Sequence, residues 1–104
     1  MTRTPSSYGT PSYETPPYYE APVSADVLLA FDGRVLEVFR YADAARYHVW
    51  EEPWLEFTSG RSPKVRIRSR IGSRRTFPYD EQLLPGIRAL ADAVAQTVAE
   101  RQRP

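Results

Sequence analysis

The sequence predicts a small α+β domain, mainly β, in which about six to seven short antiparallel strands precede one C-terminal amphipathic helix. Residues 64–71 alternate between basic and other side chains without a fault, which is the period of a strand that turns one face to water. Asp32-Gly33 separates two apolar runs, as in a β-hairpin. Apolar residues between 83 and 98 recur every three or four positions, as on one buried face of a helix.

Composition is that of an ordinary globular protein and excludes several chemistries. The 104 residues are 41% hydrophobic and 26% charged, which is enough for a small hydrophobic core. The net charge is only +1, so the protein as a whole has no strong positive potential to attract polyanions. The absence of cysteine excludes disulfides and cysteine nucleophiles. The longest apolar run, 27–31, is far shorter than the roughly 20 residues of a membrane helix. With a polar N-terminus and no transmembrane segment, the chain is predicted to be cytoplasmic.

Residues 1–24 are predicted to form a disordered tail before a domain over residues 25–104. Proline, tyrosine, serine and threonine dominate the tail, which holds too few aliphatic residues to offset the entropy lost on ordering. The sequence PPYY at 16–19 matches peptides that aromatic grooves accept. The tail is interpreted either as a docking or phosphorylation peptide or as a solvated segment, and the solvated segment is favoured. The candidate partner-docking residues are Tyr13, Pro16, Pro17, Tyr18, Tyr19 and Trp50.

The first predicted hairpin pairs strands over 27–31 and 34–41. A two-residue turn at Asp32-Gly33 would place Leu29 opposite Leu36. The residues expected on its core face are Val27, Leu29, Phe31, Leu36 and Val38.

Four more strands are predicted, at 46–50, 54–59, 64–71 and 74–79. The side chains expected to face the core are Leu55, Phe57, Val65, Ile67 and Ile71. In the strand at 46–50, Tyr47 and Val49 are expected on one face, and His48 and Trp50 on the other. A turn after residue 59 would place Glu56 opposite Arg66 and Trp54 opposite Arg68.

The predicted helix covers about residues 81–101, after strands that cover about residues 27–79. Asp80 is a suitable N-cap residue, and Pro85 fits the first turn because its missing N–H has no partner there anyway. The apolar stripe of the helix consists of Leu83, Ile87, Leu90, Ala91, Val94 and Val98.

The basic segment allows two interpretations. Its candidate anion-binding residues are Lys64, Arg66, Arg68, Arg70, Arg74 and Arg75. The planar guanidinium group of arginine can donate two hydrogen bonds to one phosphate, so one interpretation is that nucleic acid or anionic lipid is the partner. The alternative is a solvated strand face that Glu51, Glu52 and Glu56 neutralise across strands. The second interpretation is favoured.

No set of residues suited to catalysis is visible in the sequence. His48 is the only histidine and cannot form a metal cluster alone. The five glycines lie in turns or in the tail, and neither a phosphate loop nor a nucleophile elbow is present. The sequence therefore predicts a protein that is not an enzyme, with no catalytic residue, no metal ligand and no cofactor.

The chain resembles small bacterial members of the pleckstrin-homology-like (PH-like) domains over roughly residues 26–100. The resemblance rests on AFDGR at 30–34 with the strand after it, RYHV at 46–49, and TFPYD at 76–80 before the helix. It implies a small barrel of two nearly orthogonal sheets that the helix caps at one open end. It also implies a non-catalytic scaffold that binds peptides, proteins or lipids. Arginine supplies nearly all of the 14 basic residues, which indicates a GC-rich coding bias of the actinobacterial kind.

The sequence is therefore interpreted as a non-enzymatic interaction module that binds a protein or peptide through the PH-like domain, an exposed sheet edge or the tail. The alternative is binding of nucleic acid or anionic lipid through the basic segment 64–75. The two interpretations differ in their expected response to salt, because phosphate binding weakens steeply as salt rises and an apolar peptide contact barely changes.

Overall fold

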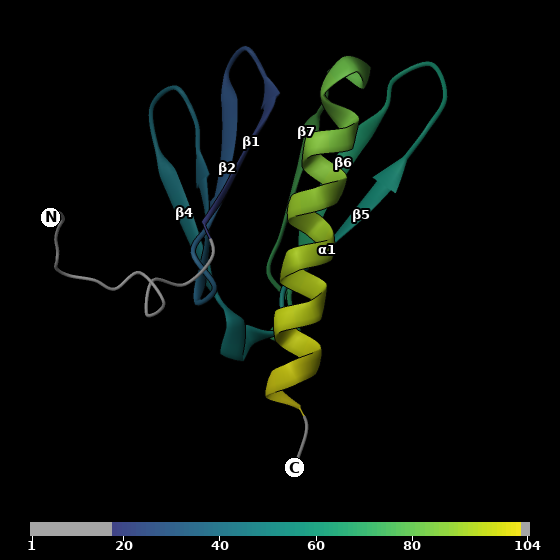
Figure 1. The fold of residues 1–104 in the computed structure, drawn as a ribbon. Helices are drawn as coiled ribbons and strands as arrows, with labels where there is room; N and C mark the ends of the chain where they lie inside the picture. The colour runs from purple at the N-terminus through teal and green to yellow at the C-terminus, as the bar shows by residue number, and fades with distance from the viewer. Residues whose placement is uncertain (1–17, 103–104) are drawn as a thin grey trace, which may run out of the picture.

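The structure is a computed structural model, and it describes residues 18–102. Two antiparallel sheets, with strand orders β1-β2-β3-β4 and β5-β6-β7, stand beside one long helix (Figure 1). The predicted α+β class, mainly β with one C-terminal helix, is confirmed. In chain order the elements are β1 (Tyr19–Ser24), β2 (Val27–Phe31), β3 (Val35–Phe39), β4 (Ala44–His48), the 3-10 helix η2 (Val49–Glu51), β5 (Trp54–Thr58), β6 (Lys64–Arg68), β7 (Arg74–Pro78), the 3-10 helix η3 (Glu81–Leu83) and α1 (Leu84–Arg101).

The predicted tail over residues 1–24 is wrong for residues 19–24, which form β1. This strand pairs antiparallel with β2 and places Ala21 opposite Leu29. Ala21 and Val23 are both 0% exposed. Two small apolar side chains at alternate positions are enough to hold an edge strand on the core, and an edge position also tolerates Pro22. The remaining residues of the predicted tail, 1–17, lie outside the described residues.

The β2–β3 hairpin forms, but its predicted register is wrong by two positions. Phe31, not Leu29, lies opposite Leu36. The Asp32 carboxylate accepts hydrogen bonds from the backbone N–H groups two and three residues later, at 2.9 Å each, and Gly33 has a φ of 92°. The turn is therefore centred on Gly33-Arg34. A shift of two positions leaves every side chain on the same face, so the five residues predicted for the core face are all buried.

The second sheet has the predicted β5–β6 register, with Glu56 opposite Arg66. Val65 and Ile67 are fully buried, as expected. Ile71 was expected to face the core, but 55% of its surface is exposed. The reason is that β6 ends at Arg68 and the chain turns before Ile71, so the alternation of basic residues extends beyond the strand.

The strand predicted over residues 46–50 also ends earlier than expected. β4 stops at His48 because Val49–Glu51 winds into η2. The Glu51 side chain accepts a hydrogen bond from the backbone N–H of His48 at 3.3 Å, which caps this short helix. Tyr47 and Val49, which the sequence places on one face of the strand, are nevertheless both buried.

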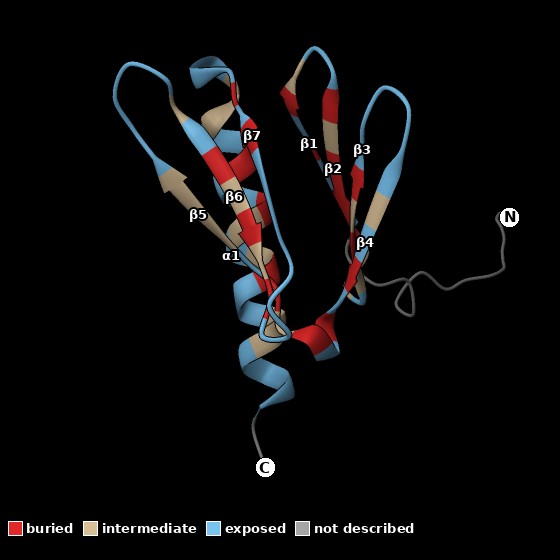
Figure 2. Ribbon diagram, turned by 180° about the vertical axis from the view of Figure 1, so that it is seen from behind, coloured by how far each residue is buried: buried red, intermediate tan, exposed pale blue. Residues whose placement is uncertain are grey.

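α1 covers one side of both sheets. It packs against β1 and β2 of the first sheet and against β5 of the second. Figure 2 shows buried residues on β1, β2 and α1, whereas the residues of β5 are intermediate or exposed. Ile87, Leu90 and Val94 form the buried part of the predicted stripe. Asp80 caps the turn that leads into α1, since its carboxylate accepts a hydrogen bond from Gln82 N–H at 3.2 Å. The core is thus shared by both sheets and the helix.

The burial of β1 yields a stability prediction. We expect Val23→Ala to lower the free energy of unfolding by about 2 kcal/mol, because it removes two buried methyl groups and leaves a cavity. Glu20→Ala, on the exposed face of the same strand, should change it by less than about 0.5 kcal/mol. Urea denaturation followed by tryptophan fluorescence measures both values. Equal changes in the free energy of unfolding for the two substitutions would show that Val23 of β1 is not packed in the core.

The turn at Asp32 yields a prediction on pH. Burial raises the pKa of Asp32, but the N–H groups of Val35 and Arg34 and the charge of Arg34 outweigh it, so the pKa lies below its ordinary 3.8. Because the pKa of Asp32 is lower in the folded chain than in the unfolded chain, the ionised carboxylate stabilises the fold at pH values above the ordinary pKa of 3.8. This stabilisation is lost as the pH falls through the lowered pKa of the folded chain. We therefore expect the stability difference between the native chain and Asp32→Ala to shrink on acidification. A difference that stays constant down to about pH 2 would contradict this assignment.

Candidate functional site

Three of the six candidate docking residues lie within the described residues, namely Tyr18, Tyr19 and Trp50. Tyr13, Pro16 and Pro17 lie outside the described residues. Tyr18 is 60% exposed, and its hydroxyl donates a hydrogen bond to Glu20 at 2.9 Å, which raises the pKa of Tyr18.

Tyr19 and Trp50 belong to different parts of the fold. Tyr19 begins β1, opposite Phe31. Trp50 lies in η2 with 52% of its surface exposed, and its ring stacks on His48 with the ring centroids 6.0 Å apart. Trp50 remains a candidate contact residue, on a different element from Tyr19.

Four of the six candidate anion-binding residues lie on the outer face of the second sheet. Lys64, Arg66 and Arg68 point outward from β6, and Arg74 is the cross-strand neighbour of Arg68. Glu56 on β5 lies 3.8 Å from the Arg66 guanidinium and 3.5 Å from that of Arg68. These ion pairs are more than one-third exposed and contribute at most about 1 kcal/mol each. The predicted neutralisation across strands is therefore confirmed for Arg66 and Arg68.

The predicted contact between Arg68 and Trp54 is also confirmed. The Arg68 guanidinium lies over the Trp54 ring, 5.6 Å from its centroid. The indole N–H of Trp54 donates to Glu56 at 3.0 Å. Trp54, Glu56 and Arg68 therefore hold one another on the strand face.

Arg70 has a structural position. Its side chain pairs with Glu52 at 3.5 Å and donates a hydrogen bond to the Trp50 carbonyl at 3.3 Å. Its backbone N–H donates to the Glu51 carbonyl at 2.8 Å. Arg70 thus connects the β6–β7 turn to η2, and its charge is paired with Glu52.

Arg75 faces the opposite way from its neighbour Arg74. Successive side chains of a strand point to opposite faces, so Arg75 shares the inner face of β7 with the buried Phe77. There its guanidinium lies beside the Tyr47 hydroxyl. Burial raises the pKa of Tyr47, and the charge and hydrogen bond of Arg75 offset only part of this rise. The candidate anion-binding residues are therefore divided among three places, namely the outer face of the second sheet, the contact of Arg70 with η2, and the inner face of β7.

Hydrogen-bond alternation identifies which backbone groups of β5 are free. Ser69 N–H donates to the Ser73 carbonyl at 3.1 Å, so the odd-numbered residues of β6 pair with β7 and the even-numbered ones with β5. The same alternation turns the backbone N–H and C=O groups of Leu55 and Phe57 to the outer edge of β5. Among residues 18–102, no strand lies beside that edge.

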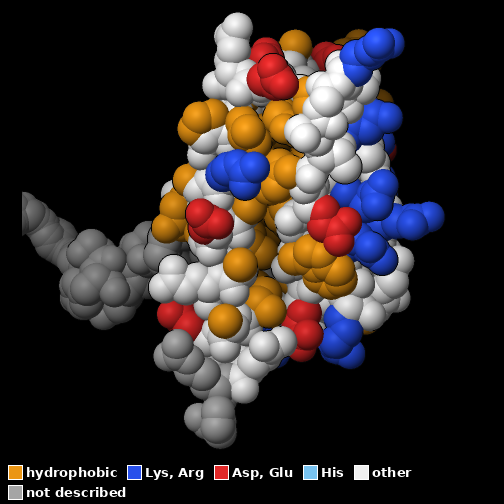
Figure 3. Space-filling view, turned by 90° about the vertical axis from the view of Figure 1, so that its right-hand side faces the viewer, with side chains coloured by type: hydrophobic (Ala, Val, Ile, Leu, Met, Phe, Trp, Pro, Cys, Tyr) orange, Lys and Arg blue, Asp and Glu red, His pale blue; other side chains and the backbone are white. Residues whose placement is uncertain are grey.

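An apolar strip lies next to the free edge of β5. Leu55 and Phe57 on β5 and Leu83 and Leu84 at the start of α1 are only partly buried. Figure 3 shows apolar side chains gathered along the middle of this face, with basic side chains of the second sheet to their right. Arg88 of α1 reaches over the Phe57 ring at 4.8 Å. We call this surface, with Arg88, the β5–α1 strip.

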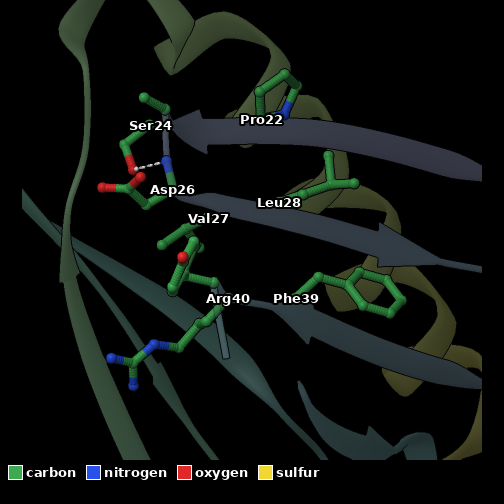
Figure 4. Close-up of a pocket in the computed structure, with 9 residues that line it drawn as sticks. Pro22, Ser24, Asp26, Val27, Leu28, Phe39 and Arg40 are labelled. Atoms are coloured by element: carbon green, nitrogen blue, oxygen red, sulfur yellow. Dashed lines mark hydrogen bonds between the residues drawn. The ribbon is translucent and has the colours of Figure 1, made fainter. Parts of the chain in front are cut away.

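A shallow hollow of ≈ 350 Å³ lies where β1, β2 and β3 end at one edge of the first sheet (Figure 4). Pro22, Leu28 and Phe39 lie on one side of it, and Asp26 and Arg40 point elsewhere. The hollow therefore lacks converging polar groups.

Two classes of site are missing from the part of the chain that the structure describes. No group of three or more potential metal ligands occurs in residues 18–102. Over the same residues, no helix combines the length and the apolar character needed to cross a bilayer. Comparison with protein-family models, with curated proteins and with solved structures found no match to this chain.

The ion pairs of Glu56 yield a prediction for polyanion binding. We expect Glu56→Gln to strengthen low-salt binding of a labelled DNA duplex about two- to threefold, because it frees Arg66 and Arg68. Asp92→Asn makes the same charge change on the exposed face of α1 and should have little effect. Fluorescence anisotropy at low ionic strength measures both. Equal strengthening by the two variants would show that net charge, and not the strand face, governs binding.

Proposed function

We propose that this chain is a non-enzymatic interaction module of the PH-like type, and that it binds an extended peptide along the free edge of β5. Two antiparallel sheets of four and three strands followed by a C-terminal helix support the PH-like assignment. The fold alone does not specify a function. The proposal therefore rests on one observation, the free edge of β5 beside the β5–α1 strip.

The edge and the strip supply the two parts of peptide recognition. The backbone groups of Leu55 and Phe57 supply hydrogen bonds to an added strand of any sequence. The strip supplies selectivity, because alternate side chains of an added strand point toward it. Arg88 lies over Phe57 and carries no acidic partner among residues 18–102. The fitting ligand is a peptide with alternating apolar residues and a nearby Asp or Glu.

The second candidate function is binding of nucleic acid or anionic lipid on the outer face of the second sheet. It is supported by Lys64 and Arg74, which form no ion pair within the described residues. Glu56 reduces the field of the other two cations on this face. The peptide function is favoured because its surface offers both unpaired backbone groups and apolar area. We also propose that the protein acts in the cytoplasm and needs no cofactor.

Amide hydrogen exchange tests the β5 edge directly. In the free protein, the N–H groups of Leu55 and Phe57 should exchange much faster than those of Glu56 and Arg66, which pair within the sheet. A peptide selected from a phage-displayed linear library should slow the exchange of Leu55 and Phe57 by at least about tenfold. Protection of other strands, with Leu55 and Phe57 unchanged, would refute this binding site.

Charge substitution on α1 tests the selectivity. Arg88→Gln should weaken binding of the selected acidic peptide by about fivefold or more, because it removes the cation at the strip. Arg101→Gln makes the same change at the far end of α1 and serves as the matched control. Isothermal titration at about 0.05 M and about 0.5 M salt also separates the two candidate functions, because polyanion binding should be lost at high salt and peptide binding largely retained.

A further inference from the structure

The side of the sandwich opposite α1 is open. α1 packs against β1, β2 and β5, whereas β4 and β7 are the outer strands of their sheets. Figure 2 shows α1 behind the strands of the second sheet. Two hollows follow one another along these strands, one of ≈ 490 Å³ at residues 45–47 and 73–75 and one of ≈ 650 Å³ that includes residues 40–43 and 76–78. We call the two together the β4–β7 furrow.

Free backbone groups of β4 point into this furrow. Val49 N–H donates to the Arg34 carbonyl at 2.9 Å, so the odd-numbered residues at the end of β4 pair with β3. By the same alternation the backbone N–H groups of Arg46 and His48 face away from β3. They have no strand partner within residues 18–102. The N–H of His48 already donates to the Glu51 carboxylate at 3.3 Å, which leaves the N–H of Arg46 for the furrow.

The opposite wall is the free edge of β7. Tyr79 N–H donates to the Pro63 carbonyl at 3.3 Å, which places the odd-numbered residues of β7 against β6. The N–H groups of Arg74 and Thr76 therefore face the furrow. Pro78 has the same orientation but lacks an N–H.

The charge of the smaller hollow is positive. Its lining holds three arginines and no acid, the full set being Ala45, Arg46, Tyr47, Ser73, Arg74 and Arg75. Arg46 is paired with Glu37 at 2.8 Å, but Arg74 and Arg75 form no ion pair among the described residues. Because they are successive residues, their side chains flank the β7 edge from its two faces. Arg74 also lies directly opposite Arg68, a like-charge neighbour that an anion would relieve.

Tyr47 adds a hydroxyl to this cluster. It is 3% exposed and belongs to the core, and it lines the same hollow as Arg75. Ser73 adds a second hydroxyl at the start of β7. Guanidinium forks, hydroxyls and free N–H groups are the donors that bind tetrahedral oxyanions.

We propose that the smaller hollow of the β4–β7 furrow binds a phosphoryl oxyanion, held by Arg75 and Arg74 with the Tyr47 hydroxyl and the Arg74 N–H. The site shares Arg74 with the outer strand face but does not include Arg66 and Arg68, which pair with Glu56. It lies between the two sheets, so a free phosphate or a small phosphate ester can reach it. A flat lipid surface cannot contact the inner face of β7 in the same way. The inference is independent of peptide binding at β5.

Titration with inorganic phosphate at constant ionic strength, followed by amide chemical shifts, tests the site. We expect saturable shifts centred on the amides of Arg46 and Arg74. Arg75→Gln should weaken phosphate binding about tenfold or more. Arg66→Gln removes an equal charge from the outer face and should weaken it less than about twofold. Tyr47→Phe should weaken binding several-fold and leave the fold intact.

Three results would overturn the proposal. The first is a set of shifts that do not saturate, and the second is equal weakening by Arg75→Gln and Arg66→Gln, which would indicate diffuse attraction. The third is binding to phosphatidylserine vesicles that depends on Arg75 while inorganic phosphate has no effect, since this would assign the residue to a membrane surface. If Arg75→Gln does not fold, Arg74→Gln answers the same question from an exposed position. No loss of phosphate binding in that variant would equally refute the site.

Discussion

The packing of α1 against two separate sheets is the contact on which the rest of the fold depends. Each sheet has one apolar face, and the sheets do not share a hydrogen-bonded strand within the described residues. Ile87, Leu90 and Val94 belong to one core with residues of both sheets and are almost completely buried. Because a sheet needs a partner layer to bury its apolar face, loss of this helix would leave both inner faces hydrated. One helix covers one side only, which is why the β4–β7 side stays open.

Much of the fold could be predicted because its periodicity is local. The alternation around Val65 and Ile67 specifies which face of β6 is buried, and the short turn after β5 then fixes the pairing of Glu56 with Arg66. The helix was predictable for the same reason, since its stripe repeats through several turns. Where a pattern repeats within one element, the sequence contains the information needed to place it.

The errors arose where the decisive contact is between elements or within a turn. β1 was missed because Ala21 and Val23 are only two apolar residues in a proline-rich stretch, and their burial depends on β2 and α1. The hairpin register was wrong because the Asp32 side chain folds back on two N–H groups and moves the turn by one residue. Ile71 continued the alternation of β6, but the strand had already ended.

The candidate sites show the same division. The sequence identified the arginines but could not separate Arg74 from Arg75 by role, although strand alternation turns them to opposite faces. Tyr47 and Ser73 gave no signal as site residues, because only the tertiary structure brings β4 near β7. The free edge of β5 was likewise beyond reach, since it depends on which strand is outermost. A site that is formed by the arrangement of strands can therefore be recognised only from the structure, even when its individual residues are conspicuous in the sequence.

Proline on an outer strand has a consequence for self-association. Pro78 lies among the edge-facing residues of β7 and offers no donor, and Pro22 lies in β1, the outer strand of the other sheet. A second copy that approached either strand would meet an interrupted row of amides and could not extend a continuous intermolecular sheet. The proline rings therefore oppose fibril-like growth from the outer edges of β7 and β1, and they do so at any pH and ionic strength.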